Sequence, residues 1–105
     1  MDGFAVIAEP IRRAIVDRLR VRGHDVGTLV SELGIPQSLV SKHLRVLREA
    51  GVAEVEVAGK RRVYRLTEQP LPDVISWVEP YVELWSVSFE RLAQTLDDEE
   101  NDDDG

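Results

Sequence analysis

The chain has 105 residues, of which 43% are hydrophobic, and its formal net charge is −7 at pH 7. This length predicts one domain with a modest core, and the absence of cysteine excludes disulfides and thiolate metal sites. The N-terminus, MDGFAVIAEP, has no basic region before an apolar run, so no signal peptide is predicted. No apolar stretch has the length of a membrane span. We therefore expect a cytoplasmic protein without contact to a membrane.

Charge is distributed unevenly along the chain. Residues 97–105 hold seven acidic side chains and no basic one, whereas residues 1–96 hold thirteen of each sign. Within residues 37–65, seven basic side chains stand against three acidic ones. The net negative charge therefore comes from the C-terminal segment, and the middle of the chain forms a basic region.

Apolar residues at helical spacing predict four helices in the first half of the chain, over residues 4–8, 10–22, 26–33 and 37–50. Pro10 suits the first turn of the second helix, where a missing N–H group costs nothing, and Gly23 ends that helix. Asp25 can cap the third helix. Gly34, in the sequence LGIP, tolerates the positive φ of a sharp turn before the fourth.

A β-hairpin and a long helix are predicted for the second half. Valine, tyrosine and leucine residues lie on both sides of the sequence AGKR, in which Gly59 supplies the turn. Residues 72–96 are predicted to be helical with a kink or a break at Pro80, because an interior proline costs about 3 kcal/mol. Residues 97–105 have nothing to bury and are predicted to form a disordered acidic tail.

These elements predict a mainly α fold with a β-hairpin wing. Their order is α-α-α-α-β-β-α, which is that of a winged helix-turn-helix domain, here over residues 1–96. The fourth predicted helix, QSLVSKHLRVLREAG, splits into two faces at about 100° per residue. One face holds Val40, Leu44 and Leu47 and is predicted to be buried. The opposite face holds polar and basic residues.

The N-terminal part of a recognition helix enters the major groove of DNA. Gln37, at the tip, can pair with adenine, and Ser38 can donate to several bases. Lys42 and Arg45 suit phosphates or guanine. An ordinary amphipathic helix with a solvated basic face is the alternative, since this apolar spacing is common.

The sequence resembles the ArsR/SmtB-type bacterial repressors from about Phe4 to Leu96. The resemblance lies in SLVSKHLRVLREAGV, followed by a hairpin that ends in RRVYRL, and in an aromatic last helix with WVEPY. It implies a homodimer built from the first and last helices, a recognition helix in the major groove, and a wing along the DNA backbone or minor groove. The positions that match the recognition helix are Gln37, Ser38, Ser41, Lys42, His43 and Arg45. Those that match the wing are Lys60, Arg61 and Arg62.

The chain departs from the family pattern at the start of this helix. Pro36 stands where a capping Ser or Thr is usual, so Ser38 or water must serve the first N–H groups. Leu39 is bulkier than the residue expected there. Both differences predict an operator preference of the chain's own.

No metal site or cofactor is predicted. Many relatives sense metals through Cys on the helix before the turn, or through His and carboxylates on the last helix, and this chain has neither set. Its two histidines cannot supply the three or four ligands of a zinc site. The last predicted helix, with WVEPY, resembles that of the metal-independent branch of the family. His24 is predicted to be solvated in a loop. His43 is expected either to serve the fold or, less commonly, to contact DNA.

Aromatic residues recur every fourth position in the last predicted helix, at Trp77, Tyr81, Trp85 and Phe89. Such a stripe is more often a core or dimer surface than a ligand pocket, and it is too apolar to remain exposed. With Phe4 and Ile7 of the first helix, it predicts the interface of a homodimer. Two-fold symmetry then predicts an inverted-repeat operator with half-sites about one helical turn apart. A pocket for a small-molecule inducer in this aromatic surface is left open.

No catalytic constellation is present, so the chain is not expected to be an enzyme. Ser41 and His43 are close in sequence, but they face different ways and lack an orienting acid. The leading prediction is a transcriptional repressor that occupies a palindromic operator in double-stranded DNA. One rival is a winged-helix module that recruits a partner protein, and another adds an organic inducer to DNA binding. The acidic tail either solubilises the chain or competes with DNA for the basic region.

Overall fold

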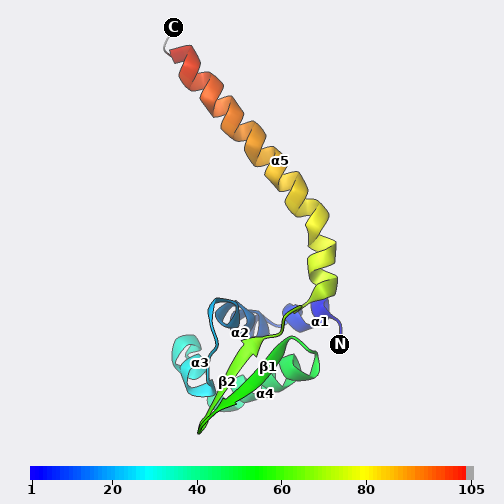
Figure 1. Cartoon of the computed structure of the whole chain (residues 1–105), viewed down its shortest axis with the longest axis vertical. Coiled ribbons are helices and arrows are strands. Elements are labelled where there is room, and N and C mark those ends of the chain that lie inside the picture. The colour runs from blue at the N-terminus through cyan, green and yellow to red at the C-terminus, as the bar shows by residue number, and fades with distance from the viewer. Residues whose placement is uncertain (104–105) are drawn as a thin grey trace. The chain divides into compact units, whose positions relative to one another are not determined.

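The computed structural model of the chain describes residues 1–103, with side chains as far as Glu99. The chain divides into a first unit, residues 1–74, and a second unit that begins at Ile75. The described residues form, in order, α1 Gly3–Ala8, α2 Pro10–Val21, α3 Val26–Leu33, α4 Gln37–Glu49, β1 Ala53–Ala58, β2 Arg61–Leu66 and α5 Pro72–Asp103. In the first unit, helices α1–α4 gather around the hairpin of β1 and β2 (Figure 1). The predicted order of elements, and with it the winged helix-turn-helix fold, is confirmed.

Local sequence signals explain where the first three helices begin and end. The side chain of Asp2 caps α1 by accepting from the Ala5 N–H group at 2.8 Å. Pro10 occupies the first turn of α2, where it removes no intrahelical hydrogen bond. Asp25 caps α3, and Gly34 ends that helix in the left-handed conformation at φ 66°, which favours glycine.

Helix α4 begins without a side-chain cap. Pro36 stands at the cap position and no side chain accepts a hydrogen bond there, so Ser38 does not replace the missing cap. The Pro36 carbonyl instead accepts from the N–H groups of Leu39 and Val40, at 3.1 and 3.2 Å. Within the described chain, no side chain accepts from the first N–H groups of α4, which lie on its exposed N-terminal side.

The wing is a two-stranded antiparallel hairpin in which Ala58 pairs with Arg61. Gly59, at φ 64°, makes the tight turn that this register requires. Tyr64 ties the hairpin to the body of the first unit, because its backbone exchanges two hydrogen bonds with His24, at 3.0 and 2.8 Å. The wing is therefore anchored to the body near the middle of β2.

The core of the first unit collects apolar side chains from every helix α1–α4 and from the hairpin. The predicted buried stripe of α4 is confirmed, since Val40, Leu44 and Leu47 are at most 1% exposed. The buried cluster contains Val6, Ile15, Leu19, Leu29, Val40, Leu44, Leu47, Val52, Ala53 and Tyr64. Burial of a side chain of this size contributes about 1.5–3 kcal/mol. The core therefore fixes which face of α4 remains outside.

Helix α5 runs from Pro72 to Asp103 without a break at Pro80. Figure 1 shows the axis of α5 bending in the yellow part of the ribbon, as expected near an interior proline. The predicted disorder of residues 97–105 differs from the structure, in which the helix continues to Asp103. Once a helix exists, each further residue adds a hydrogen bond without a new nucleation cost, so this segment can be helical without burying anything. Residues 104 and 105 lie outside the described part of the chain.

Candidate nucleic-acid interface

The exposed face of α4 holds the polar and basic residues predicted from the sequence. The core contacts of Val40, Leu44 and Leu47 turn the other side of the helix toward solvent. Exposed residues on it are Gln37, Ser38, Ser41, Lys42 and Arg45. Arg48, one turn further along, is exposed as well. The helix thus presents hydrogen-bonding groups at its N-terminus and positive charges along its length.

His43 is not part of this exposed face. Its side chain is buried at 6% exposure, and Nδ1 lies 3.4 Å from Nη1 of Arg12. Burial lowers the pKa of His43 below its ordinary value of 6.5, and the charge of Arg12 lowers it further. The ring is therefore held neutral inside the first unit. The burial of His43 favours the expected role within the fold over the less common alternative, a contact with DNA.

The wing carries the other three predicted residues, Lys60, Arg61 and Arg62, and all three are exposed. Arg61 reaches back to the body, where its Nη2 donates to Oδ2 of Asp25 at 3.0 Å. Hydrogen bonds from the Thr28 hydroxyl and N–H group, and then from Arg61, lower the pKa of Asp25 to about 2. This carboxylate is thus ionised at neutral pH, and it holds Arg61 at the N-terminus of α3.

The basic side chains of the interface fall into two groups. Arg45 pairs with Glu49 at 3.1 Å, and Arg65 pairs with Glu56 across the hairpin at 3.1 Å. These pairs are solvated and contribute little to stability. Within the described residues, four further basic side chains in this region make no ion pair: Lys42, Arg48, Lys60 and Arg62. They carry uncompensated charge that a polyanion can neutralise.

An open groove of about 700 Å³ joins α4 to the hairpin. Its lining residues are Ser41, Arg45, Arg48, Glu49, Ala53, Glu54, Val55 and Tyr64. Ser41 and Arg45 were predicted for DNA contact, whereas Arg48 and Tyr64 were not. Arg48 could have been found from the sequence, because it follows Ser41 and Arg45 at helical spacing. Helix α4 and the hairpin therefore border the same groove.

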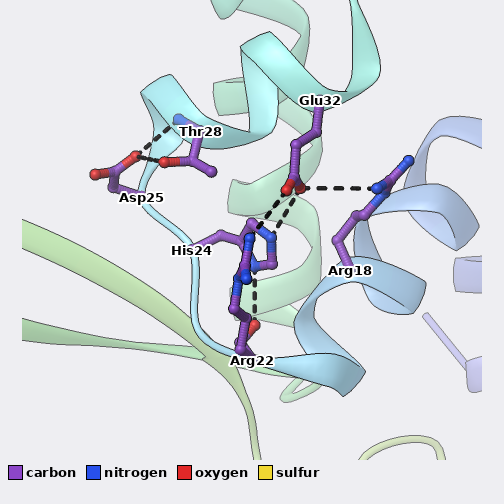
Figure 2. A network of polar contacts seen from close by, with 6 residues as sticks. All are labelled: Arg18, Arg22, His24, Asp25, Thr28 and Glu32. Carbon is purple, nitrogen blue, oxygen red and sulfur yellow. Dashed lines mark hydrogen bonds and ion pairs between the residues drawn. The ribbon is translucent and has the colours of Figure 1, made fainter.

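A polar network that the sequence did not indicate holds α3 in place (Figure 2). His24 was expected to be solvated, but it is buried at 4% exposure. Its Nδ1 lies 2.8 Å from the Arg22 carbonyl and its Nε2 lies 2.8 Å from Oε2 of Glu32. The ring of His24 therefore lies between the Arg22 carbonyl and the Glu32 carboxylate.

Glu32, on α3, is the centre of this network. Figure 2 shows its carboxylate between the His24 ring and Arg18 of α2, with distances to Arg18 and Arg22 of 3.9 and 3.3 Å. Through the backbone bridge of His24 to Tyr64, the same loop also holds the wing. The network therefore fixes α2, α3 and β2 relative to one another, and these elements support α4.

Helix α5 carries the predicted aromatic residues on an uncovered surface of the single chain. Trp77, Tyr81, Trp85 and Phe89 are 45–70% exposed, and the rings of Trp77 and Tyr81 lie 5.1 Å apart between centroids. On α1, Phe4 is 42% exposed and Ile7 is half-buried. Several exposed aromatic side chains on one helix are typical of an interaction surface.

Among the described residues, no three His, Cys, Asp or Glu side chains are grouped so that they could hold a metal ion. Within the same part of the chain, no helix has both the length and the apolar character needed to cross a membrane.

The sequence and the fold both match bacterial regulators. Residues 9–55 match the family described as bacterial regulatory protein, arsR family. The HTH-type transcriptional repressor SmtB of Mycobacterium tuberculosis is 42% identical over 69 residues, which are 66% of this chain and 51% of SmtB. The chain thus spans about half the length of that relative. A second M. tuberculosis protein, the HTH-type transcriptional regulator Rv2034, is 34% identical over 94% of this chain and 90% of its own length.

Solved structures give the same result. A protein described as a possible transcriptional regulator for arsenical resistance is 33% identical, with a TM-score of 0.68 over 86% of this chain and 96% of that one. A homodimeric winged helix-turn-helix domain from Mycobacterium bovis, at 21% identity and a TM-score of 0.63 over 77% of this chain and 75% of its own, shares the fold. SmtB and Rv2034 are thus named as transcriptional regulators, and the arsenical-resistance protein as a possible one. The chain belongs to the arsR family of bacterial regulatory proteins.

Proposed function

We propose that the chain is a cytoplasmic, homodimeric repressor that binds a palindromic operator in double-stranded DNA. The observation that carries this proposal is the surface formed by α4 and the wing. It concentrates four unpaired basic side chains beside the hydrogen-bonding tip of a helix, in a chain whose net charge is −7. Phosphate binding supplies affinity, and base contacts supply sequence preference.

Each part of the surface has its own role in this proposal. Gln37, Ser38 and Ser41 read base edges in the major groove, because they occupy the exposed first turns of α4. Lys42, Arg45 and the wing residues Lys60, Arg61 and Arg62 contact phosphates. Arg45 and Arg61 exchange carboxylate partners for phosphates when they do so, whereas the other three start without a partner.

A second copy of the chain covers the apolar surface of α5. The exposed stripe Trp77, Tyr81, Trp85 and Phe89 supports this step, as does the homodimer named for the M. bovis relative of the same fold. Phe4 and Ile7 of α1 complete the interface. Two-fold symmetry repeats the α4 surface, which requires an inverted repeat with half-sites about 10 base pairs apart.

The repressor is proposed to work without a metal ion. His24 and His43 are both buried against protein partners, so neither side chain is available as a surface ligand. Repression then depends on occupancy of the operator alone.

Selection of DNA from a random library by the full chain tests this function. The expected product is an inverted repeat that the protein binds at least 10³-fold more tightly than a scrambled duplex at about 0.15 M salt. Fluorescence anisotropy with both duplexes gives the ratio, and sedimentation gives two protomers per duplex. Equal binding of both duplexes, or no salt-sensitive binding at all, would refute the proposal. In the second case, the basic surface would serve a protein partner instead.

A further inference from the structure

Arg12, near the start of α2, joins three helices of the first unit. Its Nε donates to the carbonyl of Val6 at 2.8 Å, and its Nη2 donates to the carbonyl of Ala5 at 3.0 Å. Both carbonyls belong to the last turn of α1, where helical carbonyls have no partner within the helix. A positive charge at this end of a helix is favourable. The third nitrogen, Nη1, lies 3.4 Å from Nδ1 of His43 on α4.

The contact between Arg12 and His43 depends on the proton of the imidazole ring. A guanidinium group has only donors, so Nδ1 must present its lone pair and the ring must be neutral, with its proton on Nε2. The charged groups that act on the ring are Arg12 and Glu9 at the start of α2 and Lys42 on α4. Burial, Arg12 and Lys42 lower the pKa of His43, and Glu9 opposes them. Protonation would place two cations against each other in a buried position.

The other end of α1 is held by the beginning of α5. The N–H group of Gly3 donates to Oδ2 of Asp73 at 2.8 Å, and Asp73 lies in the first turn of α5. The approach is so close that a side chain at position 3 would overlap Oδ1 of Asp73. Helix α1 is thus held at its start by α5 and at its end by Arg12.

We propose that Arg12 is a positioning residue that couples the placement of α1 to the orientation of the recognition helix α4, through a neutral His43. This inference rests on the proposed function, in which α1 and α5 form the dimer interface and α4 reads DNA. Dimerisation fixes the position of α1, and Arg12 binds the last carbonyls of that helix. The same guanidinium group positions the ring of His43. The position of this ring in turn determines the angle at which α4 enters the groove. Operator binding consequently weakens when His43 takes up a proton.

Arg12→Lys tests the coupling in the full-length dimer. Lysine keeps the charge, but its single nitrogen cannot reach both α1 carbonyls and the imidazole ring together. We expect operator affinity to fall about 10-fold, in the usual range of couplings between sites. Non-specific affinity and the dimer dissociation constant should stay unchanged. Arg13→Lys is the matched control, because Arg13 is exposed and, within the described residues, makes no ion pair.

His43→Asn tests the role of the proton. Its amide oxygen can replace Nδ1 as acceptor for Arg12, but it does not titrate. Because the pKa of His43 is lowered, the wild type should lose operator affinity relative to His43→Asn only as the pH falls below the ordinary histidine value of 6.5, while both bind equally well at about pH 7.5. His24 is present in both proteins, so the comparison isolates the substitution at position 43.

Three results would overturn the inference. One is an Arg12→Lys protein that is folded by circular dichroism and binds the operator as tightly as the wild type. Another is identical pH profiles for the wild type and His43→Asn, which decides the matter even if Arg12→Lys does not fold. The third is a wild type that binds no operator at any pH, which removes the proposed function as well. The first two leave the proposed function intact, so the two failures are distinguishable.

Discussion

The unpaired basic side chains of α4 and the wing should set the salt dependence of DNA binding. The double variant Lys42→Ala, Arg62→Ala removes one of them from the helix and one from β2. Neither side chain makes an ion pair within the described part of the chain, and both are exposed. Their removal therefore leaves no buried charge unpaired, and the fold should keep its stability.

The size of the effect follows from the number of phosphate contacts. A dimer loses about four of them, and each contributes about 0.9 to the slope of log K against log salt concentration, so the slope should flatten by about 3.6. Between about 50 and 200 mM salt, the variant should then lose about 150-fold less affinity than the wild type. At low salt, its absolute affinity should be clearly weaker for every DNA sequence.

Fluorescence anisotropy over a series of salt concentrations measures both slopes. The control is Arg20→Ala, Arg91→Ala, which makes the same change in net charge with two exposed arginines outside α4 and the hairpin. This control should keep the slope of the wild type. Equal slopes for wild type and Lys42→Ala, Arg62→Ala would refute the placement of phosphates on this surface. Equal flattening in the control would assign the effect to net charge alone.

Three further predictions concern assembly and stability. Trp85→Glu puts a charge into the exposed aromatic stripe of α5, where Trp85 is 55% exposed in the single chain. Sedimentation should show monomers with an unchanged fold. A persistent dimer would contradict the proposed interface. Leu47→Ala truncates a fully buried side chain of α4 and should lower the free energy of unfolding in urea by about 2–5 kcal/mol. The control is Leu84→Ala, at a 60% exposed position, which should change the free energy of unfolding of the monomer little. For Asp25, whose pKa is about 2 in the folded chain instead of 3.8, the unfolded chain binds the proton more readily. Its stabilisation is present above pH 3.8 and is lost as the pH falls through about 2. Asp25→Asn keeps a cap for α3 but should remove this part of the acid-induced loss of stability in urea titrations, and an identical acid limb in both proteins would contradict the assigned cause.

The sequence predicted helix α4 and the hairpin correctly, because both elements follow from local periodicity. Val40, Leu44 and Leu47 recur at helical spacing, and Gly59 lies between two runs of β-type residues. His43 stands three residues after Val40 and four before Leu47, which is also a buried position. Its polar side chain suggested the border of the exposed face instead. The position of His43 on the helix therefore predicts its burial better than the polarity of its side chain does.

The partners of the buried histidines could not be predicted in the same way. His24 is buried because Glu32, from the far end of α3, and the carbonyl of Arg22 meet at its ring. Arg12 contacts His43, which is 31 residues away in the sequence. Such contacts depend on how the helices pack, which periodicity does not specify. The length of α5 was also missed, since composition predicted disorder where an established helix simply continues.

Placement of α4 on DNA is the central claim, and the absence of cysteine from the chain allows a direct test. Ser38→Cys provides a single thiol at the exposed tip of α4, to which an iron chelate that cleaves nearby DNA can be attached. On the selected operator, we predict two clusters of cleavage in the major groove, about 10 base pairs apart and related by two-fold symmetry. The same chelate on Asp17→Cys, at an exposed position of α2, should cleave weakly. Equal cleavage from both positions, or no cleavage from Ser38→Cys on a bound operator, would contradict the account.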